Sequence, residues 1–309
     1  MIVTVTCNPA IDITYRVDRL QPGEVHRVRD VATRPGGKGV NVARVLHQLG
    51  EQTTATGLAD AFFGVTLEAL GVPAVFVPAL AGVRRTLVVH ADSAPATTSL
   101  WEPGAAPADP TAAAVLLIEQ VTALLTDASA LVVSGSLPPG VDPALPAGLA
   151  TVATAAGIPA VLDLDDAALR VAADGGGAVL VPNRDELARL SGAAGDLDVV
   201  AAARDLSARS RAPVVATLGA DGMLAVAGRD CWHARPAEHV AGNPTGAGDA
   251  AAAAIARGLA HRNPWPDVLA DAVALSSACV LAPVAGEVDL DYYQRVRPMI
   301  TATPTDSLS

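Results

Sequence analysis

Residues 242–250 read GNPTGAGDA and run directly into an alanine-rich stretch. Gly246 and Gly248 let backbone N–H groups approach an anion, and a helix that begins here adds partial positive charge at its N-terminus. Asp249 lies beside this anion site, where a carboxylate repels a phosphate unless it takes a proton from a nucleophile. We therefore predict that Asp249 is a general base, with a plain helix cap as the alternative.

A second glycine-rich loop, PGGKGVNVARVL, covers residues 35–46. Gly36, Gly37 and Gly39 surround Lys38, and Asn41 follows in the first turn of the expected helix. A lysine among glycines at a helix N-terminus forms a compact anion site, which suits a substrate phosphate. The alternative is an ordinary solvated surface lysine.

The sequence GAGDAA also fits the G-x-G-x-x-A pattern of dinucleotide-binding proteins. That pattern needs a strand before the loop and another strand after the helix. Here residues 237–241 make a doubtful strand, and a second helix follows the first. The context therefore excludes a nicotinamide-dependent oxidoreductase, and no GxxxxGK[ST] phosphate loop is present.

The elements that must position these loops alternate between strands and helices. Residues 1–6, 130–134, 160–164, 178–181 and 213–218 are expected strands, and the longer stretches between and after them have helical patterns. This alternation predicts an α/β fold, a doubly wound parallel sheet with helices on both faces. Segments 11–33 and 84–102 have β-type alternation instead, which predicts a small β-sheet lid, with irregular loops as the alternative.

The composition excludes several classes of protein. Of 309 residues, 51% are apolar, and 21 Lys and Arg stand against 32 Asp and Glu, which gives a net charge of −11. This composition is too apolar for a disordered chain, and the net charge is too negative to favour sequence-independent nucleic-acid binding. We see no signal peptide and no membrane-spanning run, and three unpatterned cysteines indicate buried thiols. We expect a cytoplasmic enzyme with no nucleic-acid or membrane partner.

Six motifs together resemble one family: CNPAIDITY, PGGKGVNVARVL, SGSLPPG, VPNRDEL, TLGADG and NPTGAGDA. Their order and spacing are similar to those of PfkB-type sugar kinases of the ribokinase superfamily, especially the branch of 1-phosphofructokinase and tagatose-6-phosphate kinase. The resemblance implies a ribokinase-like doubly wound sheet with a β-sheet lid, as one kinase domain over 1–309. It implies transfer of the ATP γ-phosphoryl group to a sugar hydroxyl with Mg²⁺, and a homodimer through the lid. It leaves activation by K⁺ open.

The resemblance also implies roles for individual residues. Asp249 would be the general base, and Gly246, Ala247 and Gly248 would form the anion hole for the transferring group. Asn183 and Glu186 match the N-x-x-E motif that organises Mg²⁺ through water. The residues implied to bind ATP are Asn183, Thr217, Leu218, Gly219, Ala220, Asp221, Gly222 and Gly248. The residues implied to hold the sugar are Asp12, Gly37, Lys38 and Asn41, with Arg85 helping Lys38 to bind its phosphate.

The chain departs from that branch mainly around the acceptor. Leu87, Ser99 and Trp101 replace polar groups in the lid, where an apolar residue leaves sugar hydroxyls unpaired. Trp101 either stacks on a sugar ring or covers the lid. Asp165 and Asp166 stand where the branch has a D-x-S-G motif, and they either hold a metal or cap the next helix.

These observations lead to a first acceptor and several alternatives. Fructose 1-phosphate, converted to fructose 1,6-bisphosphate, is the expected acceptor. Tagatose 6-phosphate, fructose 6-phosphate, and an unphosphorylated sugar or nucleoside are alternatives within the same fold. A non-catalytic sugar-phosphate binding protein is the alternative from a different class.

Overall fold

The computed structural model of the chain describes residues 1–93, 97–192, 197–282 and 284–308, except for the side chains of Thr97 and Asp166. The strands are β1 (Ile2–Thr6), β2 (Ala10–Val17), β3 (Asp30–Gly36), β4 (Thr53–Ala59), β5 (Ala74–Pro78), β6 (Arg84–Ala91), β7 (Thr97–Trp101), β8 (Ala130–Gly135), β9 (Ala160–Leu164), β10 (Val179–Leu180), β11 (Val214–Thr217), β12 (Met223–Ala227), β13 (Asp230–Ala234) and β14 (Thr303–Pro304). The α-helices are α1 (Lys38–Gln48), α2 (Phe63–Glu68), α3 (Pro110–Leu124), α4 (Leu145–Ala155), α5 (Asp166–Ala172), α6 (Arg184–Ser191), α7 (Val199–Ser210), α8 (Ala247–Ala260), α9 (Trp265–Leu281) and α10 (Leu290–Val296). Short 3₁₀ turns lie at η1 (Leu125–Asp127), η2 (Gly219–Asp221) and η3 (Arg297–Met299).

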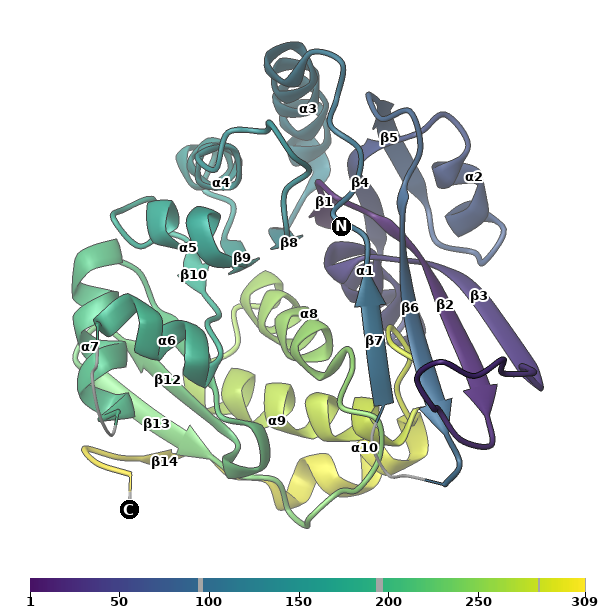
Figure 1. Ribbon diagram of the computed structural model, residues 1–309. Coiled ribbons are helices and arrows are strands. Elements are labelled where there is room, and N and C mark those ends of the chain that lie inside the picture. The colour runs from purple at the N-terminus through teal and green to yellow at the C-terminus, as the bar shows by residue number, and fades with distance from the viewer. Residues whose placement is uncertain (94–96, 193–196, 283, 309) are drawn as a thin grey trace.

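A large central sheet forms the middle layer, in the order β14-β13-β12-β11-β10-β9-β8-β1-β4-β5 (Figure 1). The strands from β11 to β5 pair in parallel, and β12, β13 and β14 add an antiparallel edge. Strand β1, IVTVT, is buried at every position because helices cover both faces of the sheet. The predicted α/β fold with helices on both faces is confirmed, and the antiparallel edge adds to it.

Two hydrophobic cores lie on the two faces of this sheet. Helices α3, α4 and α7 contribute Leu117, Leu149 and Leu206 to one core, and α1, α8 and α9 contribute Leu46, Ile255 and Leu275 to the other. Helix α8 is unusual because its alanines, from Ala250 to Ala256 with Ile255 among them, are all fully buried. These small side chains let α8 approach both α9 and the sheet closely.

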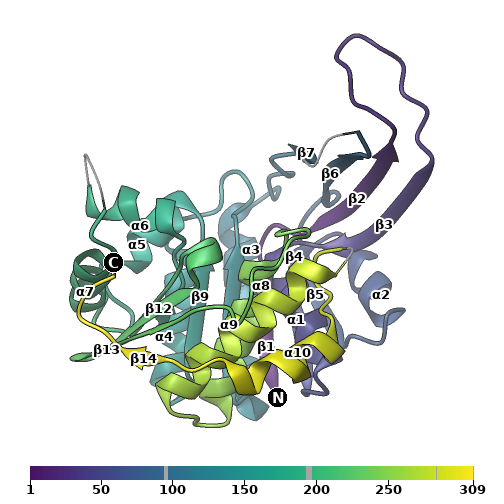
Figure 2. The same ribbon diagram turned by 90° about the horizontal axis from the view of Figure 1, so that it is seen from below.

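A separate four-stranded sheet, in the order β3-β2-β6-β7, projects from the body of the molecule (Figure 2). We refer to this sheet as the lid. It forms from the two segments that the sequence assigned to a lid. Asn8 ties the lid to the main sheet, because its Nδ2 donates to the carbonyl of Pro103 at 3.0 Å and to Ser136 Oγ at 3.2 Å.

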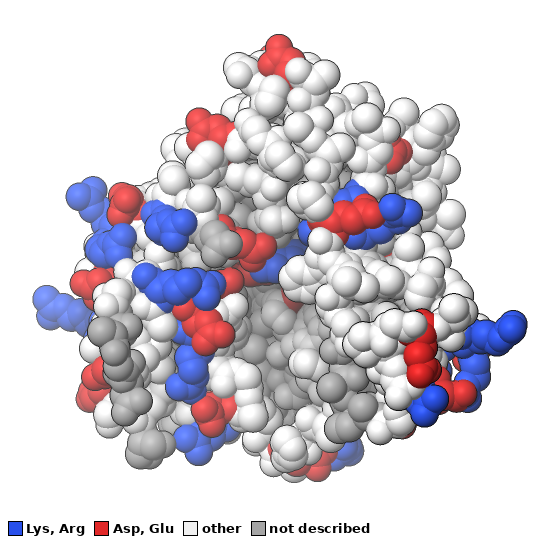
Figure 3. All heavy atoms as spheres, viewed as in Figure 1, with Lys and Arg blue, Asp and Glu red and all other residues white. Residues whose placement is uncertain are grey.

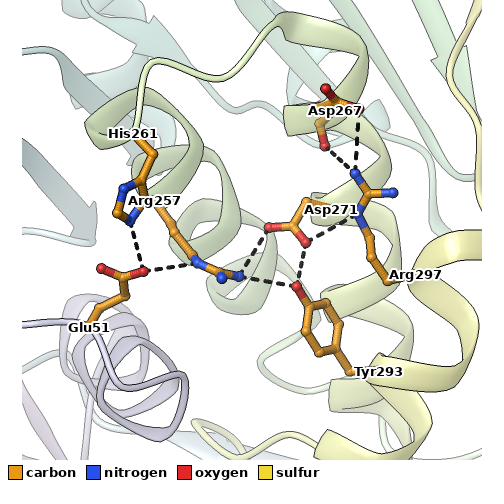
Figure 4. A network of polar contacts seen from close by, with 7 residues as sticks. All are labelled: Glu51, Arg257, His261, Asp267, Asp271, Tyr293 and Arg297. Atoms are coloured by element: carbon orange, nitrogen blue, oxygen red, sulfur yellow. Dashed lines mark hydrogen bonds and ion pairs between the residues drawn. The ribbon is translucent and has the colours of Figure 1, made fainter.

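A polar network joins the C-terminal ends of α1 and α8 to α9 and α10 (Figure 4). Glu51 accepts hydrogen bonds from Arg257 Nε and pairs with His261 Nε2, each at 3.0 Å. Arg257 also donates to the hydroxyl of Tyr293 at 3.1 Å, and that hydroxyl donates to Asp271 at 2.6 Å. The network therefore fixes one end of the two helices, whose N-terminal ends carry Lys38, Asn41 and Asp249.

Two further sequence expectations can be compared with the structure. Cys7, Cys231 and Cys279 are free and buried, as the absence of a ligand spacing indicated. Within the described part of the chain, no helix is both long enough and apolar enough to cross a bilayer.

Candidate active site

The carboxyl ends of the central parallel strands lie near the N-termini of α1 and α8, beside the lid (Figure 1). We refer to this end of the sheet, with Lys38, Asn41, Asp163, Asp165 and Asp249, as the cleft. In parallel α/β sheets this edge is where ligands bind, because loops and helix N-termini converge there. Figure 3 shows acidic and basic side chains gathered side by side across the middle of this face. The site is built from residues that follow β1, β8, β9, β10 and β11.

Asp249 lies in the first turn of α8 and is only 6% exposed. Its Oδ2 accepts a hydrogen bond from Asn41 Nδ2 of α1 at 2.8 Å. Burial, reinforced by the charge of Asp163, raises the pKa of Asp249 to about 7, although Lys38 and the Asn41 hydrogen bond oppose this shift. The structure therefore brings Asp249, Asn41 and Lys38 together, as their motifs predicted.

The loop before α8 has the backbone geometry of an anion site. Gly246 has a φ of 89°, a left-handed conformation that glycine adopts without strain. A Cβ at Gly248 would face open space, and its N–H belongs to the first turn of α8, where no acceptor exists within the helix. Ala247 instead donates its N–H to the carbonyl of Pro244 at 3.1 Å, so it shapes the turn.

Lys38 is the first residue of α1, after Gly37 with a φ of 105°. Its Nζ lies 2.8 Å from Asp165 Oδ1 and 3.2 Å from Asp163 Oδ1. Burial would lower the pKa of Lys38, but the two carboxylates outweigh burial and raise the pKa above its usual value. Asp163 is held in turn by Ser134 Oγ, which donates to its Oδ2 at 2.9 Å.

Asp12 of β2 faces the cleft from the lid and accepts a hydrogen bond from Thr86 of β6. Burial raises the pKa of Asp12, while Thr86, Arg44 and Arg84 act against this shift. The structure therefore places Asp12 within electrostatic reach of Arg44, Arg84 and Asp249.

Arg85 does not lie with Lys38. Its guanidinium pairs with Glu102 at 2.6 Å and is exposed beside Leu87 and Leu100. The neighbouring Arg84 lies in the cleft instead, where it interacts electrostatically with the carboxylates of Asp12 and Asp165. Adjacent residues of a strand point to opposite faces of the sheet, so Arg84 faces the cleft and Arg85 faces away from it. The sequence-based interpretation had assigned the neighbouring arginine.

The predicted ATP-binding residues surround the ends of β10 and β11. Asn183 and Thr217 form an isolated parallel bridge, which brings the two loops together. Leu218, Gly219, Ala220, Asp221 and Gly222 form the tight turn into β12, closed by the Leu218 N–H to the Gly222 carbonyl at 2.9 Å. The carboxylate of Asp221 pairs with Arg184 at 2.7 Å, so its charge is already matched within the protein.

Asn183 and Glu186 form a capping box at the start of α6. The Asn183 side chain accepts from the Glu186 N–H at 2.9 Å, and Glu186 Oε2 accepts from the Asn183 N–H at 2.8 Å. Burial raises the pKa of Glu186, although the Asn183 N–H opposes this shift. Among the described residues no three His, Cys, Asp or Glu side chains gather as a direct metal site.

Two further predictions from the sequence concern Trp101 and the two neighbouring aspartates, Asp165 and Asp166. Trp101 is the last residue of β7 and is 70% exposed, so it covers part of the lid surface. Asp165 occupies the N-cap position of α5 but makes no capping hydrogen bond. The side chain of Asp166 lies outside the described part of the structure.

Sequence reasoning missed Arg84, Asp163 and Ser134 as members of the site. Asp163 and Ser134 had a usable signal, because each is the last residue but one of a buried strand of the parallel sheet. Arg44 of α1 was also missed; it is buried and donates to the carbonyl of Ala285 at 3.0 Å and to Glu287 at 3.1 Å.

The fold is ribokinase-like. Residues 5–290 match the model of the pfkB family of carbohydrate kinases, and the chain belongs to this family. It is a carbohydrate kinase, a phosphotransferase with an alcohol group as acceptor.

Solved structures agree with this assignment. Phosphofructokinase-2 from Escherichia coli in complex with potassium is 29% identical with a TM-score of 0.88, over 96% of this chain and 98% of that chain. Its structures with fructose-6-phosphate and in a tetrameric inhibited form are each 30% identical, with a TM-score of 0.87 and the same coverage. A protein from Thermotoga maritima, described as a possible 1-phosphofructokinase, shares the fold at 22% identity and a TM-score of 0.86, over 99% of this chain and 100% of that chain.

Proposed function

We propose that the chain transfers the γ-phosphoryl group of ATP to a hydroxyl of a sugar, and that Asp249 takes the proton of that hydroxyl. The observation that carries this proposal is the position of Asp249. It is buried at the N-terminus of α8, beside the glycine loop, and burial raises its pKa to about 7. A base with a pKa near the working pH is suited to accept a proton during transfer.

The other residues of the cleft position the reactants. We infer that the N–H groups of Gly246 and Gly248 hold the oxygens of the transferring group. Asn41, which donates to Asp249 Oδ2 at 2.8 Å, would orient the carboxylate. Glu186 uses one carboxylate oxygen in the capping box, which leaves the other oxygen for a water bound to Mg²⁺. When bound, Mg²⁺ supplies neutralisation of the phosphate charge. Phosphoryl transfer depends chiefly on such positioning, so no covalent nucleophile is required.

The acceptor that the sequence favours is fructose 1-phosphate. Similarity to a phosphofructokinase solved with fructose-6-phosphate supports a phosphorylated acceptor. An unphosphorylated sugar is the second candidate, and the ion pairs of Lys38 with Asp163 and Asp165 favour it.

The experiment that tests the proposal is a coupled assay of ADP release with Mg·ATP. The acceptors are fructose 1-phosphate, fructose 6-phosphate, tagatose 6-phosphate, free fructose and ribose. Acceptor-dependent ADP release is the expected result. Absence of turnover with every acceptor, together with binding of a sugar phosphate, would instead identify a non-catalytic binding protein.

The turnover number is expected to rise with pH and to reach a plateau above about pH 8. The Asp249 carboxylate must be deprotonated to accept a proton, and with a pKa of about 7 only about one tenth of it is charged at pH 6. Measurement of kcat at saturating substrates between pH 5.5 and 9 gives the midpoint. Circular dichroism at each pH controls for unfolding, and a flat profile would contradict the assignment of Asp249 as the base.

We also propose a homodimer through the outer face of the lid, in line with the tetrameric form of the Escherichia coli relative. Ile13, Tyr15, Leu87, Leu100 and Trp101 line a shallow groove there, and Leu100 is 58% exposed. Leu100 and Trp101 are exposed and the other three are half-buried, and a contiguous apolar patch of this kind on a surface favours association.

Substitution Leu100→Glu is expected to halve the mass of the protein in solution, because a carboxylate in an apolar contact is costly to desolvate. Light scattering after size-exclusion chromatography measures that mass. Leu116→Glu, at a leucine of α3 that is 50% exposed, is the matched control and is expected to leave the mass unchanged. A monomeric wild type would contradict the proposal.

Dependence on K⁺ is a further proposal, supported by the potassium complex of the same relative. We expect a higher kcat in KCl than in NaCl at equal ionic strength. Equal values of kcat in KCl and NaCl would contradict this proposal.

A further inference from the structure

The ammonium group of Lys38 is already paired before any substrate arrives. Its Nζ contacts Asp165 Oδ1 at 2.8 Å and Asp163 Oδ1 at 3.2 Å. Asp163 is nearly inaccessible, with a side chain only 9% exposed, and Ser134 holds its second oxygen at 2.9 Å. A phosphate that reached Lys38 would therefore lie against two carboxylates that already share this cation.

The Asp165 carboxylate is held by its contact with Lys38 in the cleft and not by a capping hydrogen bond to its own helix. Asp165 has the extended backbone of an N-cap residue, with φ of −97° and ψ of 149°, at the start of α5. Its side chain accepts no hydrogen bond from the N–H groups of the helix, which is the usual partner at this position. It reaches Lys38 instead, so its charge acts on the acceptor side of the cleft.

The arginines near the acceptor side are also engaged. Arg84 donates to the carbonyls of Asn8 at 3.3 Å and Glu102 at 3.2 Å, and it faces the carboxylates of Asp12 and Asp165. Arg44 binds Glu287, which also pairs with Arg34 of the lid. Among these described cations, Lys38 and Arg44 pair directly with carboxylates, and Arg84 lies within electrostatic reach of Asp12 and Asp165.

Carboxyl groups outnumber cations in this connected group of ionisable residues. The carboxylates that act on one another and on Lys38 or Arg84 are Asp12, Asp163, Asp165, Glu186 and Asp249. The cations that act electrostatically on the same carboxylates are Lys38, Arg44 and Arg84, and of these Lys38 contacts two of them directly. A phosphate monoester carries about −1.5 to −2 charges at neutral pH, and like charges in a confined site repel strongly. Sugar hydroxyls, in contrast, donate hydrogen bonds to carboxylates.

We propose that Asp165 is a specificity-determining residue that disfavours phosphorylated acceptors, and that the acceptor of this chain is an uncharged sugar. This inference rests on the proposed sugar kinase function. It replaces the sequence-based expectation of fructose 1-phosphate, which depended on Lys38 and Arg85 as partners of the phosphate. Arg85 lies outside the cleft, and the charge of Lys38 is matched by Asp163 and Asp165.

The test compares kcat/KM for free fructose and ribose with kcat/KM for fructose 1-phosphate and fructose 6-phosphate. Wild type is expected to favour an unphosphorylated sugar. Asp165→Asn keeps the shape of the side chain and removes its charge, so it is expected to raise kcat/KM for a phosphorylated acceptor about tenfold or more, through a lower KM. The free sugar is expected to change much less.

Asp174→Asn is the matched control, because Asp174 is an exposed carboxylate just after α5 that pairs with Arg209 outside the cleft. It is expected to leave the ratio between acceptors unchanged. Asp165→Ser repeats the test with a smaller neutral side chain if the asparagine variant unfolds. A wild type that prefers a phosphorylated sugar, or a ratio that Asp165→Asn and Asp165→Ser leave unchanged, would overturn the inference.

Binding measured by calorimetry separates this inference from the kinase proposal. Titration of fructose and of fructose 1-phosphate into wild type and Asp165→Asn reports selectivity without turnover. Absence of ADP release with selective binding of the uncharged sugar would contradict the kinase proposal alone. Equal binding of fructose 1-phosphate to wild type and Asp165→Asn would contradict the role of Asp165 alone.

Discussion

Replacement of Asp249 by asparagine is expected to lower kcat by about 10²- to 10⁴-fold, with little change in KM for ATP. Asparagine has nearly the same shape as aspartate but cannot accept the proton of the attacking hydroxyl. The amide also has to present its oxygen to Asn41 Nδ2, which now lies 2.8 Å from Asp249 Oδ2, so the local packing is preserved. Steady-state kinetics with the best acceptor measure both parameters.

The control for this variant is Asp267→Asn. Asp267 is also a carboxylate in the first turn of a helix, but it belongs to α9 and pairs with Arg297 at 3.7 Å, outside the cleft. Its kcat is expected to match wild type. A kcat for Asp249→Asn within tenfold of wild type would show that another group takes the proton.

Replacement of Gly222 by alanine is expected to lower the free energy of unfolding by about 3 kcal/mol or more. Gly222 has a φ of 88° at the turn from β11 into β12. A Cβ there would overlap the carbonyl oxygen of Ala234, which belongs to the backbone of β13 and cannot move aside as a side chain can. Two costs therefore add: an unfavourable backbone conformation, and separation of strands that now pack closely.

Urea denaturation of the two variants Gly222→Ala and Gly228→Ala separates these costs. Gly228 also has a left-handed conformation, with a φ of 65°, but a Cβ there would meet open space. Gly228→Ala is expected to lose only about 1 kcal/mol. An equal loss in both variants would show that the turn at Gly222 relaxes freely. Because this turn borders the proposed ATP site, KM for ATP is also expected to rise in Gly222→Ala.

Much of the site could be predicted because its residues are contiguous in sequence. Lys38 and Asn41 share one glycine-rich loop, and Asp249 follows another, so local pattern and helix polarity predict where they lie. The parallel order of the sheet follows from alternating strands and helices. The hairpin of β12 and β13 was not predicted, since the last strand expected before the final helices ends at residue 218.

Other features depend on contacts that no local pattern encodes. Arg84 and Arg85 are adjacent and chemically identical, and only the pairing of Asp12 with Thr86 across β2 and β6 decides which one faces the cleft. Asp165 stands at a position where a helix cap is the usual role, and its partner Lys38 is far away in the chain. Such residues are assigned only when the fold brings distant strands together.

The buried alanines of α8 have a consequence for how this enzyme can evolve. The proposed base, Asp249, lies in the first turn of a helix whose residues from Ala250 to Ala256 are all fully buried. A larger side chain in this helix would displace its N-terminus and with it the 2.8 Å contact between Asp249 and Asn41. We therefore expect substitutions that adapt the chain to a new acceptor to fall in the lid and at the strand ends, and few of them within α8.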